Sequence, residues 1–229
     1  MKRLLLIPLL ALPLIAQPVP TVNVTGTAWV GAIWPHDLTF EWHCESTTAE
    51  YSVGDTSGTL VSSAVITNTE AYDGTSSLLI PTSYDYATFD VTDEDLGTGD
   101  AGTVTFAVRL DTIVSAMHLV TPYSASSNYV SVQVGDGGKL FLRYVGALTQ
   151  HIVTNSTAVS TGVWHTVSAK WRTNASPYLS ISVDDGAPAE GTSELTPISA
   201  PLTSMRFGET ASYSPFFYLD DIRVYKSWK

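Results

Sequence analysis

The chain has 229 residues and a formal net charge of −11 at pH 7, from 22 acidic residues against 11 lysines and arginines. This excess of acid argues against nucleic acids and anionic membranes as partners, and it is compatible with a secreted protein, a cation binder or simple solubility. Hydrophobic residues make up 44% of the chain, which is enough for a packed core. Cys44 is the only cysteine, so the sequence excludes an internal disulfide and a cluster of thiolate metal ligands.

Residues 1–16, MKRLLLIPLLALPLIA, have the pattern of a secretory signal peptide. Lys2 and Arg3 precede an apolar run from Leu4 to Ile15, which has the length of a signal core and is short for a membrane span. We therefore expect cleavage after Ala16 and a secreted or cell-surface protein. A retained leader would instead predict a hydrophobic anchor or an assembly segment.

From about residue 22 onward, apolar and polar residues alternate in short runs. The run GTVTFAVRLD, residues 102–111, places its valines, phenylalanine and leucine on one face of a strand and Thr103, Thr105 and Arg109 on the other. NYVSVQVG, KLFLRYV and YLSISVDD repeat this period of two, and turns rich in glycine, aspartate and asparagine separate the runs. The pattern predicts an all-β sandwich or barrel in a single domain spanning residues 22–229.

The final segment, FYLDDIRVYKSWK, is an apolar strand that carries two adjacent acids. Alternation places Asp220 with Ile222 and Val224, on what we expect to be the core face, and pairs Asp221 with Arg223 on a solvated face. A buried carboxylate costs free energy unless it is hydrogen-bonded, paired or bound to a metal. We therefore expect Asp220 to be hydrogen-bonded, paired with a positive charge or bound to a metal.

Three segments occur in a characteristic order: YDGTSSLLIP at 72–81, GVWHTVSAKWRTNASPYLSISVDDG at 162–186 and FYLDDIRVYK at 217–226. Together they resemble a laminin G-like domain of the concanavalin A-like jelly-roll class, over about residues 38–226. The resemblance implies an antiparallel two-sheet β-sandwich with a jelly-roll fold. Related carbohydrate-binding modules share the Phe40–Glu41 start and the acidic final strand. This fold hosts many functions, so it does not settle the activity.

The resemblance also implies one structural calcium ion, held between the first strand, the loop before SSLLIP and the last strand. The matching positions are Glu41, Asp73, Thr75 and Asp220. Calcium takes about six to eight oxygen ligands, mostly from carboxylates and backbone carbonyls. The alternative is that Asp220 accepts hydrogen bonds from backbone amides or from a tyrosine.

Candidate ligand-binding residues are aromatic side chains in turn-like contexts and polar side chains on strands. Tyr84, Tyr86 and Tyr213 lie in turn-like segments, whereas most other aromatic residues are expected in the core. Polysaccharide lyases of this fold class use arginine, glutamine, histidine and tyrosine on neighbouring strands. These residue types are supplied here by Arg109, His118, Gln133 and Tyr144. Of these four, Arg109 and Gln133 join the three tyrosines as candidate ligand contacts.

No catalytic residue is assigned. The chain has no Glu-x-Asp-x-x-Glu strand of a jelly-roll glucanase, no Gly-x-Ser-x-Gly elbow and no local lyase motif. We expect a secreted, non-catalytic module that recognises a glycan or an extracellular protein, as a monomer or a homo-oligomer. The alternatives are a structural or adhesive subunit of a surface layer, fibre or virion, and a polysaccharide-degrading glycosidase or lyase.

Overall fold

The computed structural model describes residues 37–229 except 53–55, 92–99, 126–127, 199 and 210–215. Within these residues the strands pair antiparallel in two sheets, one of nine strands and one of seven. A short 3-10 turn at Asp136–Gly138 is the one helical element in this part of the chain. Among the described residues, no helix is long and apolar enough to cross a membrane. The predicted leader, residues 1–16, and the expected domain start at residue 22 lie outside the described residues.

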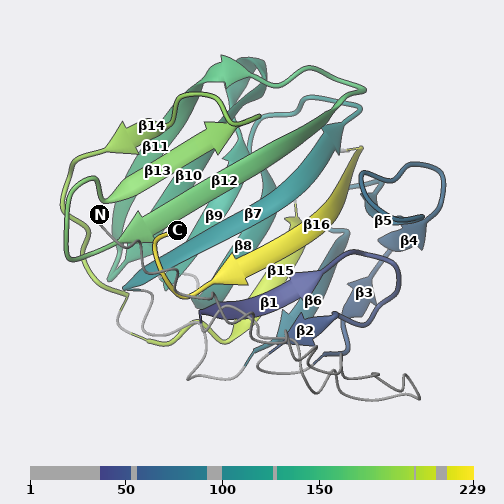
Figure 1. Ribbon diagram of the computed structural model, residues 1–229, viewed down its shortest axis with the longest axis horizontal. Helices are drawn as coiled ribbons and strands as arrows, with labels where there is room; N and C mark the ends of the chain where they lie inside the picture. The colour runs from purple at the N-terminus through teal and green to yellow at the C-terminus, as the bar shows by residue number, and fades with distance from the viewer. Residues whose placement is uncertain (1–36, 53–55, 92–99, 126–127, 199, 210–215) are drawn as a thin grey trace, which may run out of the picture. The chain divides into compact units, whose positions relative to one another are not determined.

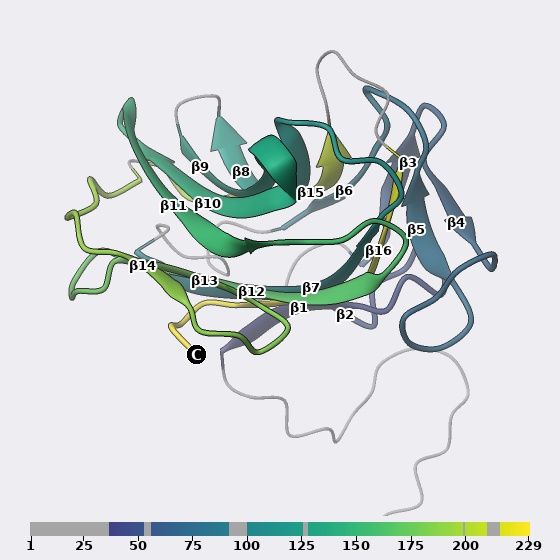
Figure 2. The same ribbon diagram turned by 90° about the horizontal axis from the view of Figure 1, so that it is seen from above.

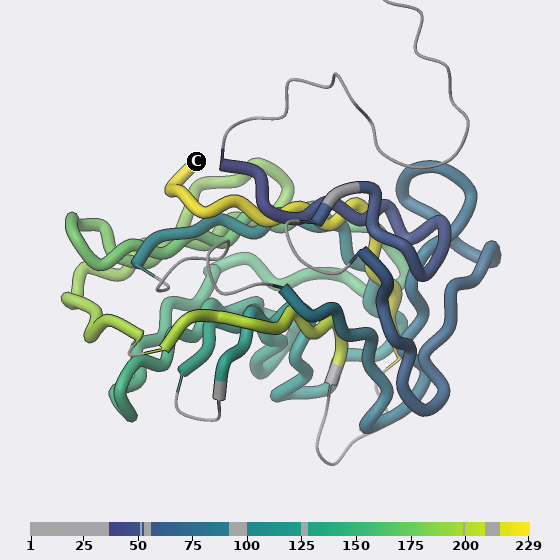
Figure 3. Tube along the Cα trace, turned by 90° about the horizontal axis from the view of Figure 1, so that it is seen from below, coloured from purple at the N-terminus to yellow at the C-terminus, as the bar shows by residue number. Residues whose placement is uncertain are grey.

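The nine-stranded sheet contains both the first and the last strand of the fold (Figure 1). Its order is β14 (Ala189–Gly191), β13 (Leu179–Val183), β12 (Trp164–Arg172), β7 (Ala101–Leu110), β16 (Phe217–Tyr225), β1 (Leu38–Trp42) and β2 (Tyr51–Ser52). In addition, β5 (Ser77–Ile80) pairs with β16, and β4 (Val65–Thr67) pairs with β5. Figure 3 shows β1 and β16 side by side in one layer, so the first and the last described strand are neighbours in the sheet.

The seven-stranded sheet packs face to face with the nine-stranded one (Figure 2). Its order is β11 (Thr149–Ala158), β10 (Lys139–Gly146), β9 (Asn128–Val134), β8 (Met117–Ala125), β15 (Ser204–Glu209), β6 (Tyr86–Asp90) and β3 (Thr59–Val61). Strands distant in sequence, such as β15 and β6, lie next to each other. The predicted antiparallel two-sheet sandwich of the jelly-roll class is therefore confirmed.

The core lies between the sheets and consists of the inward residues of each strand. The valines, phenylalanine and leucine of GTVTFAVRLD and the valines of NYVSVQVG are all in it, as alternation predicts. At its centre Phe40 and Trp42 of β1 meet Phe89 of β6 and Phe207 of β15, with ring centroids 4.8–5.9 Å apart. Aromatic pairs at this spacing add to the free energy of burial. Because the core uses one face of each sheet, the opposite faces are left for solvent and ligands.

The last strand departs from simple alternation at Asp220. Phe217 and Leu219 lie in the core before it, and Ile222 and Val224 lie in the core after it. The inward positions therefore change from odd to even residue numbers within one strand. Asp220 falls on the outer side of the sheet and not on the face of Ile222 and Val224, so its predicted core-face position is wrong. Its predicted burial is nevertheless right, because its exposed fraction is 0%.

A β-bulge in β16 causes this change of phase. Asp220 lies opposite Ala107 of β7 and Arg223 lies opposite Thr105, so β16 has one residue more than its neighbour between these pairs. Asp221 has a φ of 47°, in the left-handed region that aspartate and asparagine enter more readily than most residues. A bulge inserts one residue and re-aims the side chains around it. The two adjacent acids thus mark the irregularity of the strand.

Candidate functional site

Asp220 lies where β16 changes its neighbour. Residues 217–219 of β16 pair with β5, and residues 222–225 pair with β1. At the junction the Asp220 carboxylate accepts hydrogen bonds from three backbone amides. Its Oδ2 accepts the N–H of Tyr72 at 2.9 Å and that of Asp73 at 3.0 Å, and its Oδ1 accepts the N–H of Asp221 at 2.7 Å. Burial raises the pKa of Asp220 to about 6, against the opposing effect of these three donors. The carboxylate therefore ties the loop before β5 to the last strand.

A second carboxylate holds the same loop from the other side. Glu45 accepts the N–H and the hydroxyl of Thr75, both at 2.6 Å, and the N–H of Ser76 at 3.2 Å. The hydroxyl and N–H of Thr75 lower the pKa of Glu45. Gly74 has a φ of 68°, and a Cβ atom there would collide with Glu45 Oε1. The glycine is thus needed for the conformation of the loop and for the close approach of Glu45.

The four residues predicted to bind calcium do not converge on one point. The Asp220 carboxylate faces backbone amides, and the Thr75 hydroxyl donates to Glu45. Glu41 accepts from Arg223 Nε at 2.8 Å and contacts His43 Nε2 at 3.2 Å. Asp73 has an exposed side chain. The structure therefore has an explanation of Asp220 that needs no metal, and calcium stays a prediction.

A different group of side chains has ligand atoms close together. His43, Asp73 and Asp221 each offer one atom, and these atoms lie within 4.8 Å of one another. Calcium prefers an all-oxygen site, and a histidine nitrogen does not suit it. The nearby Arg223 guanidinium also pairs with both Asp221 oxygens, at 2.9 and 2.7 Å. The positive charge of this guanidinium would repel a metal ion bound by the three side chains.

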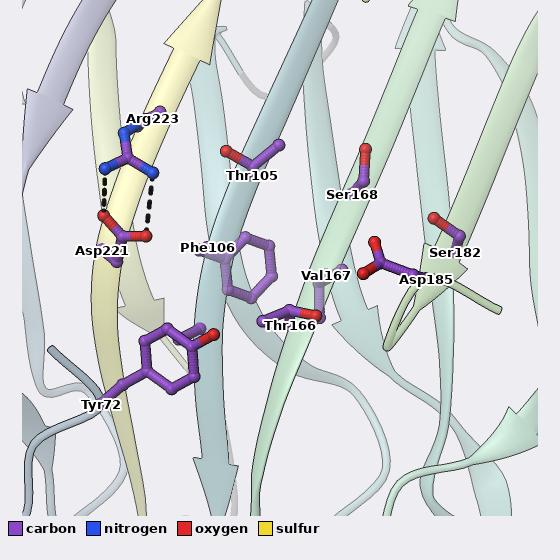
Figure 4. Close-up of a pocket in the computed structure, with 11 residues that line it drawn as sticks. Tyr72, Thr105, Phe106, Thr166, Val167, Ser168, Ser182, Asp185, Asp221 and Arg223 are labelled. Atoms are coloured by element: carbon purple, nitrogen blue, oxygen red, sulfur yellow. Dashed lines mark hydrogen bonds and ion pairs between the residues drawn. The ribbon is translucent and has the colours of Figure 1, made fainter.

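A cavity of about 210 Å³ opens on the outer face of the nine-stranded sheet, beside the Asp220 junction (Figure 4). Short hydroxyl side chains from three strands line it: Thr105 of β7, Thr166 and Ser168 of β12, and Ser182 of β13. The register sets Ser182 opposite Ser168, and Ser168 opposite Thr105. The hydroxyls therefore form a row across the sheet, about 4.8 Å from strand to strand.

Charged and aromatic residues surround this row of hydroxyls. Asp221 and Arg223 lie on one side, paired with each other, and Asp185 lies on the other (Figure 4). Tyr72 adds an aromatic wall; it is 46% exposed, and its ring lies 5.9 Å from that of Trp164. The loop that Asp220 and Glu45 hold is the segment that carries Tyr72. We name this site the hydroxyl cavity.

The outer face of the seven-stranded sheet has a different character. Arg206 of β15 lies between Tyr86 and Tyr123, 5.1 and 4.9 Å from their ring centroids. Arg143 of β10 lies 5.5 Å from the ring centroid of Tyr129. Stacking of this kind restrains a guanidinium and leaves the edges of its plane available for hydrogen bonds. We name this surface the Arg–Tyr face.

Two buried polar side chains lie on β9, the strand next to that of Arg143. Gln133 and Ser131 of β9 are 2% and 0% exposed, and Gln133 Nε2 donates to Ser131 Oγ at 2.6 Å. Ser131 lies opposite Arg143 in the register. Arg143 Nε is itself buried, and no described residue accepts a hydrogen bond from it. The planar Arg143 guanidinium thus lies beside a polar floor formed by Gln133 and Ser131, and its Nε donor is unused.

A hollow of about 460 Å³ lies on the same sheet. Phe141, Ile152 and Lys139 line it together with Asp136 and three small residues. Ile152 lies directly opposite Arg143 in the register. The volume falls within the range of about 300–1,000 Å³ found for sites that take drug-sized ligands.

The predicted ligand residues fall into separate places. Tyr86 and Gln133 both lie on the Arg–Tyr face, on strands β6 and β9. Arg109 lies on the opposite sheet, where it pairs with Glu70 and Asp111. Tyr84 is 60% exposed and lies just before β6, and Tyr213 lies outside the described residues.

The residue types expected of a lyase do not gather in one site. His118 and Gln133 are register partners, but Arg109 belongs to the other sheet. Tyr144 lies in the core, where its hydroxyl accepts the N–H of Ile198 at 3.0 Å and burial raises its pKa to about 12. The sequence predictions missed Arg143, although it occupies a polar position in the alternating run KLFLRYV, and they missed Arg206.

No protein-family profile matches this chain, and no curated protein matches it in sequence. Solved structures do match it in fold. The receptor-binding domain of a botulinum neurotoxin C/D mosaic serotype is 11% identical, with a TM-score of 0.65, over 84% of this chain and 48% of that one. The binding domain of Paraclostridial Mosquitocidal Protein 1 is 14% identical, with a TM-score of 0.65, over 84% and 49%.

The binding domain of botulinum neurotoxin DC, solved in complex with SialylT, is 8% identical, with a TM-score of 0.66, over 85% of this chain and 49% of that one. This chain thus spans about half the length of the structures that it matches. At such identities the likeness establishes the fold and leaves the ligand open. The chain shares its two-sheet jelly-roll sandwich with part of these toxin binding domains.

Proposed function

We propose that this protein is a secreted, non-catalytic module that binds a glycan on the Arg–Tyr face, with a preference for glycans that carry an acidic sugar. The observation that carries the proposal is Arg143. Its guanidinium is stacked on Tyr129, its Nε has no acceptor among the described residues, and its cross-strand neighbour Ile152 lines the hollow of about 460 Å³. Planar guanidinium donors match carboxylate oxygens in pairs, so an acidic sugar would satisfy them.

The surroundings of Arg143 favour a sugar over an apolar ligand. Gln133 and Ser131 form a polar floor, and Phe141 adds an aromatic side chain beside the hollow. A ligand without hydroxyl or carboxylate groups would leave the polar groups at this site unmatched, which costs free energy. The relatives in fold are described as binding domains of toxins, one of them in complex with SialylT, and this supports a binding role. Secretion rests on the signal-like residues 1–16.

The test is a glycan array followed by calorimetric titration of the best ligand. We expect acidic glycans to bind and Arg143→Ala to weaken their binding about tenfold or more, because a charge-assisted hydrogen bond is lost. Lys226→Ala is the matched control. It removes one positive charge at an exposed position just after β16, in the nine-stranded sheet, and the variant should bind as the wild type does. Unchanged binding by Arg143→Ala, or a folded protein that binds nothing on the array, would contradict the proposal.

A further inference from the structure

The hydroxyl cavity lies on the other sheet and differs in charge from the Arg–Tyr face. We infer that it is a second binding site, which takes a small polyhydroxylated ligand carrying a protonated amine, such as an amino sugar. Its volume of about 210 Å³ is below the range of drug-sized sites, so it suits a single sugar ring. This inference is separate from the proposed function, because it concerns different residues and a ligand of opposite charge.

The row of hydroxyls supplies the recognition of a sugar. Thr105, Ser168 and Ser182 lie side by side on three neighbouring strands, so their hydroxyls are spaced about 4.8 Å apart, comparable with the width of one sugar ring. A hydroxyl group both donates and accepts, so this floor can pair with ligand hydroxyls of either orientation. Tyr72 stands beside the row with nearly half of its surface exposed. An aromatic ring in this position can cover the apolar face of a sugar or a cation.

The charges around the cavity favour a cation. Asp185 and Asp221 line it, and Glu41 lies just behind Arg223. Arg223 is the one basic residue that lines it, and both Asp221 and Glu41 already use its guanidinium. The carboxylates therefore outnumber the guanidinium, so an anionic sugar is repelled and an ammonium group is attracted. Asp185 is exposed, and it lines the cavity on the side away from Asp221 and Arg223 (Figure 4).

A lysine side chain of a protein partner would fit this cavity less well. Its ammonium group would meet Asp185, but its apolar stem would cover the hydroxyls of Thr105, Ser168 and Ser182 without offering hydrogen bonds. Covering polar groups without partners costs free energy. A ligand that combines an amine with several hydroxyls satisfies both the carboxylate and the row of hydroxyls.

The experiment is a titration of the full chain, followed by NMR or calorimetry, with glucosamine, glucose, N-acetylglucosamine and glucuronic acid. We expect protonated glucosamine to bind, the two neutral sugars to bind at least severalfold more weakly, and glucuronic acid not to bind at this site. Asp185→Asn keeps the size of an exposed side chain and removes its charge; we expect it to weaken glucosamine binding about tenfold. Thr105→Val, which removes one hydroxyl at nearly constant volume, should weaken glucosamine and glucose alike.

Arg143→Ala is the control on the opposite sheet and should leave glucosamine binding unchanged. Equal binding of glucose and glucosamine, no binding of glucosamine, or full binding by Asp185→Asn would each overturn the inference. Loss of acidic-glycan binding in Arg143→Ala alone tests the proposed function, so failure of one site is distinguishable from failure of the other.

Discussion

Two buried aspartates, Asp220 and Asp85, perform the same structural task in different surroundings. Both are 0% exposed, and both accept hydrogen bonds from backbone amides of a neighbouring loop. Asp85 receives the N–H of Ser63 at 2.9 Å and both the N–H and the hydroxyl of Thr82, at 2.8 and 2.7 Å. The pKa of Asp85 is lowered, whereas that of Asp220 is raised to about 6.

The difference shows what decides the charge of a buried carboxylate. Burial raises the pKa of both groups, and hydrogen bonds to the charged form lower it. At Asp85 the donors, hydroxyls among them, outweigh burial. At Asp220 the three donors are all backbone N–H groups and the adjacent Asp221 adds a like charge, so burial prevails. A complete set of backbone donors is thus not sufficient to keep an acid at its ordinary pKa.

The largest effect is expected from Asp220→Ala, which leaves the N–H groups of Tyr72, Asp73 and Asp221 without acceptors at a buried junction. We expect a loss of about 4 kcal/mol in the free energy of unfolding, measured by denaturant titration. The control is Asp221→Ala, which breaks the partly exposed pair with Arg223 and should cost about 1 kcal/mol. Equal losses in the two variants would show that the backbone donors at the junction find other partners.

The pH dependence of stability should distinguish the two aspartates. Because the pKa of Asp220 is about 6 in the folded protein and 3.8 is its ordinary value, the folded state binds the extra proton between these pH values. The contribution of Asp220 is fully present below pH 3.8 and is lost as the pH rises through about 6, by up to about 3 kcal/mol. Asp85 acts in the opposite sense: its contribution is present above its ordinary pKa of 3.8 and is lost as the pH falls through its lower folded value.

The measurement is the free energy of unfolding of the wild type and of Asp220→Asn across this pH range. The difference between them should shift in favour of the wild type as the pH falls. A constant difference would mean that the pKa of Asp220 is not raised in the folded protein.

Asp85→Ala should cost less than Asp220→Ala, about 2 kcal/mol, because Thr82 is exposed and water can replace the acceptor of its N–H and hydroxyl groups. Thermal unfolding of the two alanine variants side by side gives the comparison. If Asp85→Ala proved the more damaging, water would not be replacing the lost acceptor at Thr82.

The smallest effect is expected from metal removal. Calcium that binds only the folded state would stabilise it by mass action. If the predicted site at Asp220 and Asp73 is real, a chelator lowers the melting temperature of the wild type slightly and leaves that of Asp220→Ala unchanged. Equal melting of the wild type in chelator and in excess calcium would leave Asp220 as a carboxylate held by backbone amides alone.

Sequence reasoning singled out Asp220 and overlooked Asp85, and the cause is local context. Asp220 interrupts an apolar strand, where an acid is conspicuous. Asp85 lies between Tyr84 and Tyr86 in SYDYATF, which has the composition of an exposed turn. Tyr84 is indeed exposed, but Tyr86 begins β6 and packs on Arg206, and Asp85 is buried between them. The composition of the segment thus indicated a turn, but it did not indicate that Asp85 is buried and holds the turn through its hydrogen bonds.

The ligand residues show a similar division. Tyr86 and Gln133 belong to one face, and Arg109 does not, because adjacency between strands depends on how the whole chain pairs. Arg143 and Arg206 are 63 positions apart in the sequence and lie on one sheet only after β8, β9, β10 and β15 have paired. No local pattern brings them together.

Alternation of apolar and polar residues was enough to predict which side chains of each regular strand enter the core, because alternation is a property of the extended chain and burial of apolar residues selects its face. The number of such strands and the turns between them also predicted the class of the fold. Which outward faces lie together, and where alternation breaks, depends on long-range pairing of the strands. The bulge at Asp221 and the partner change of β16 arise from the pairing of β16 with β7, β5 and β1. These long-range pairings decide on which face of the sheet Asp220 lies. They also position the loop that carries Tyr72 and the hydroxyl cavity beside it.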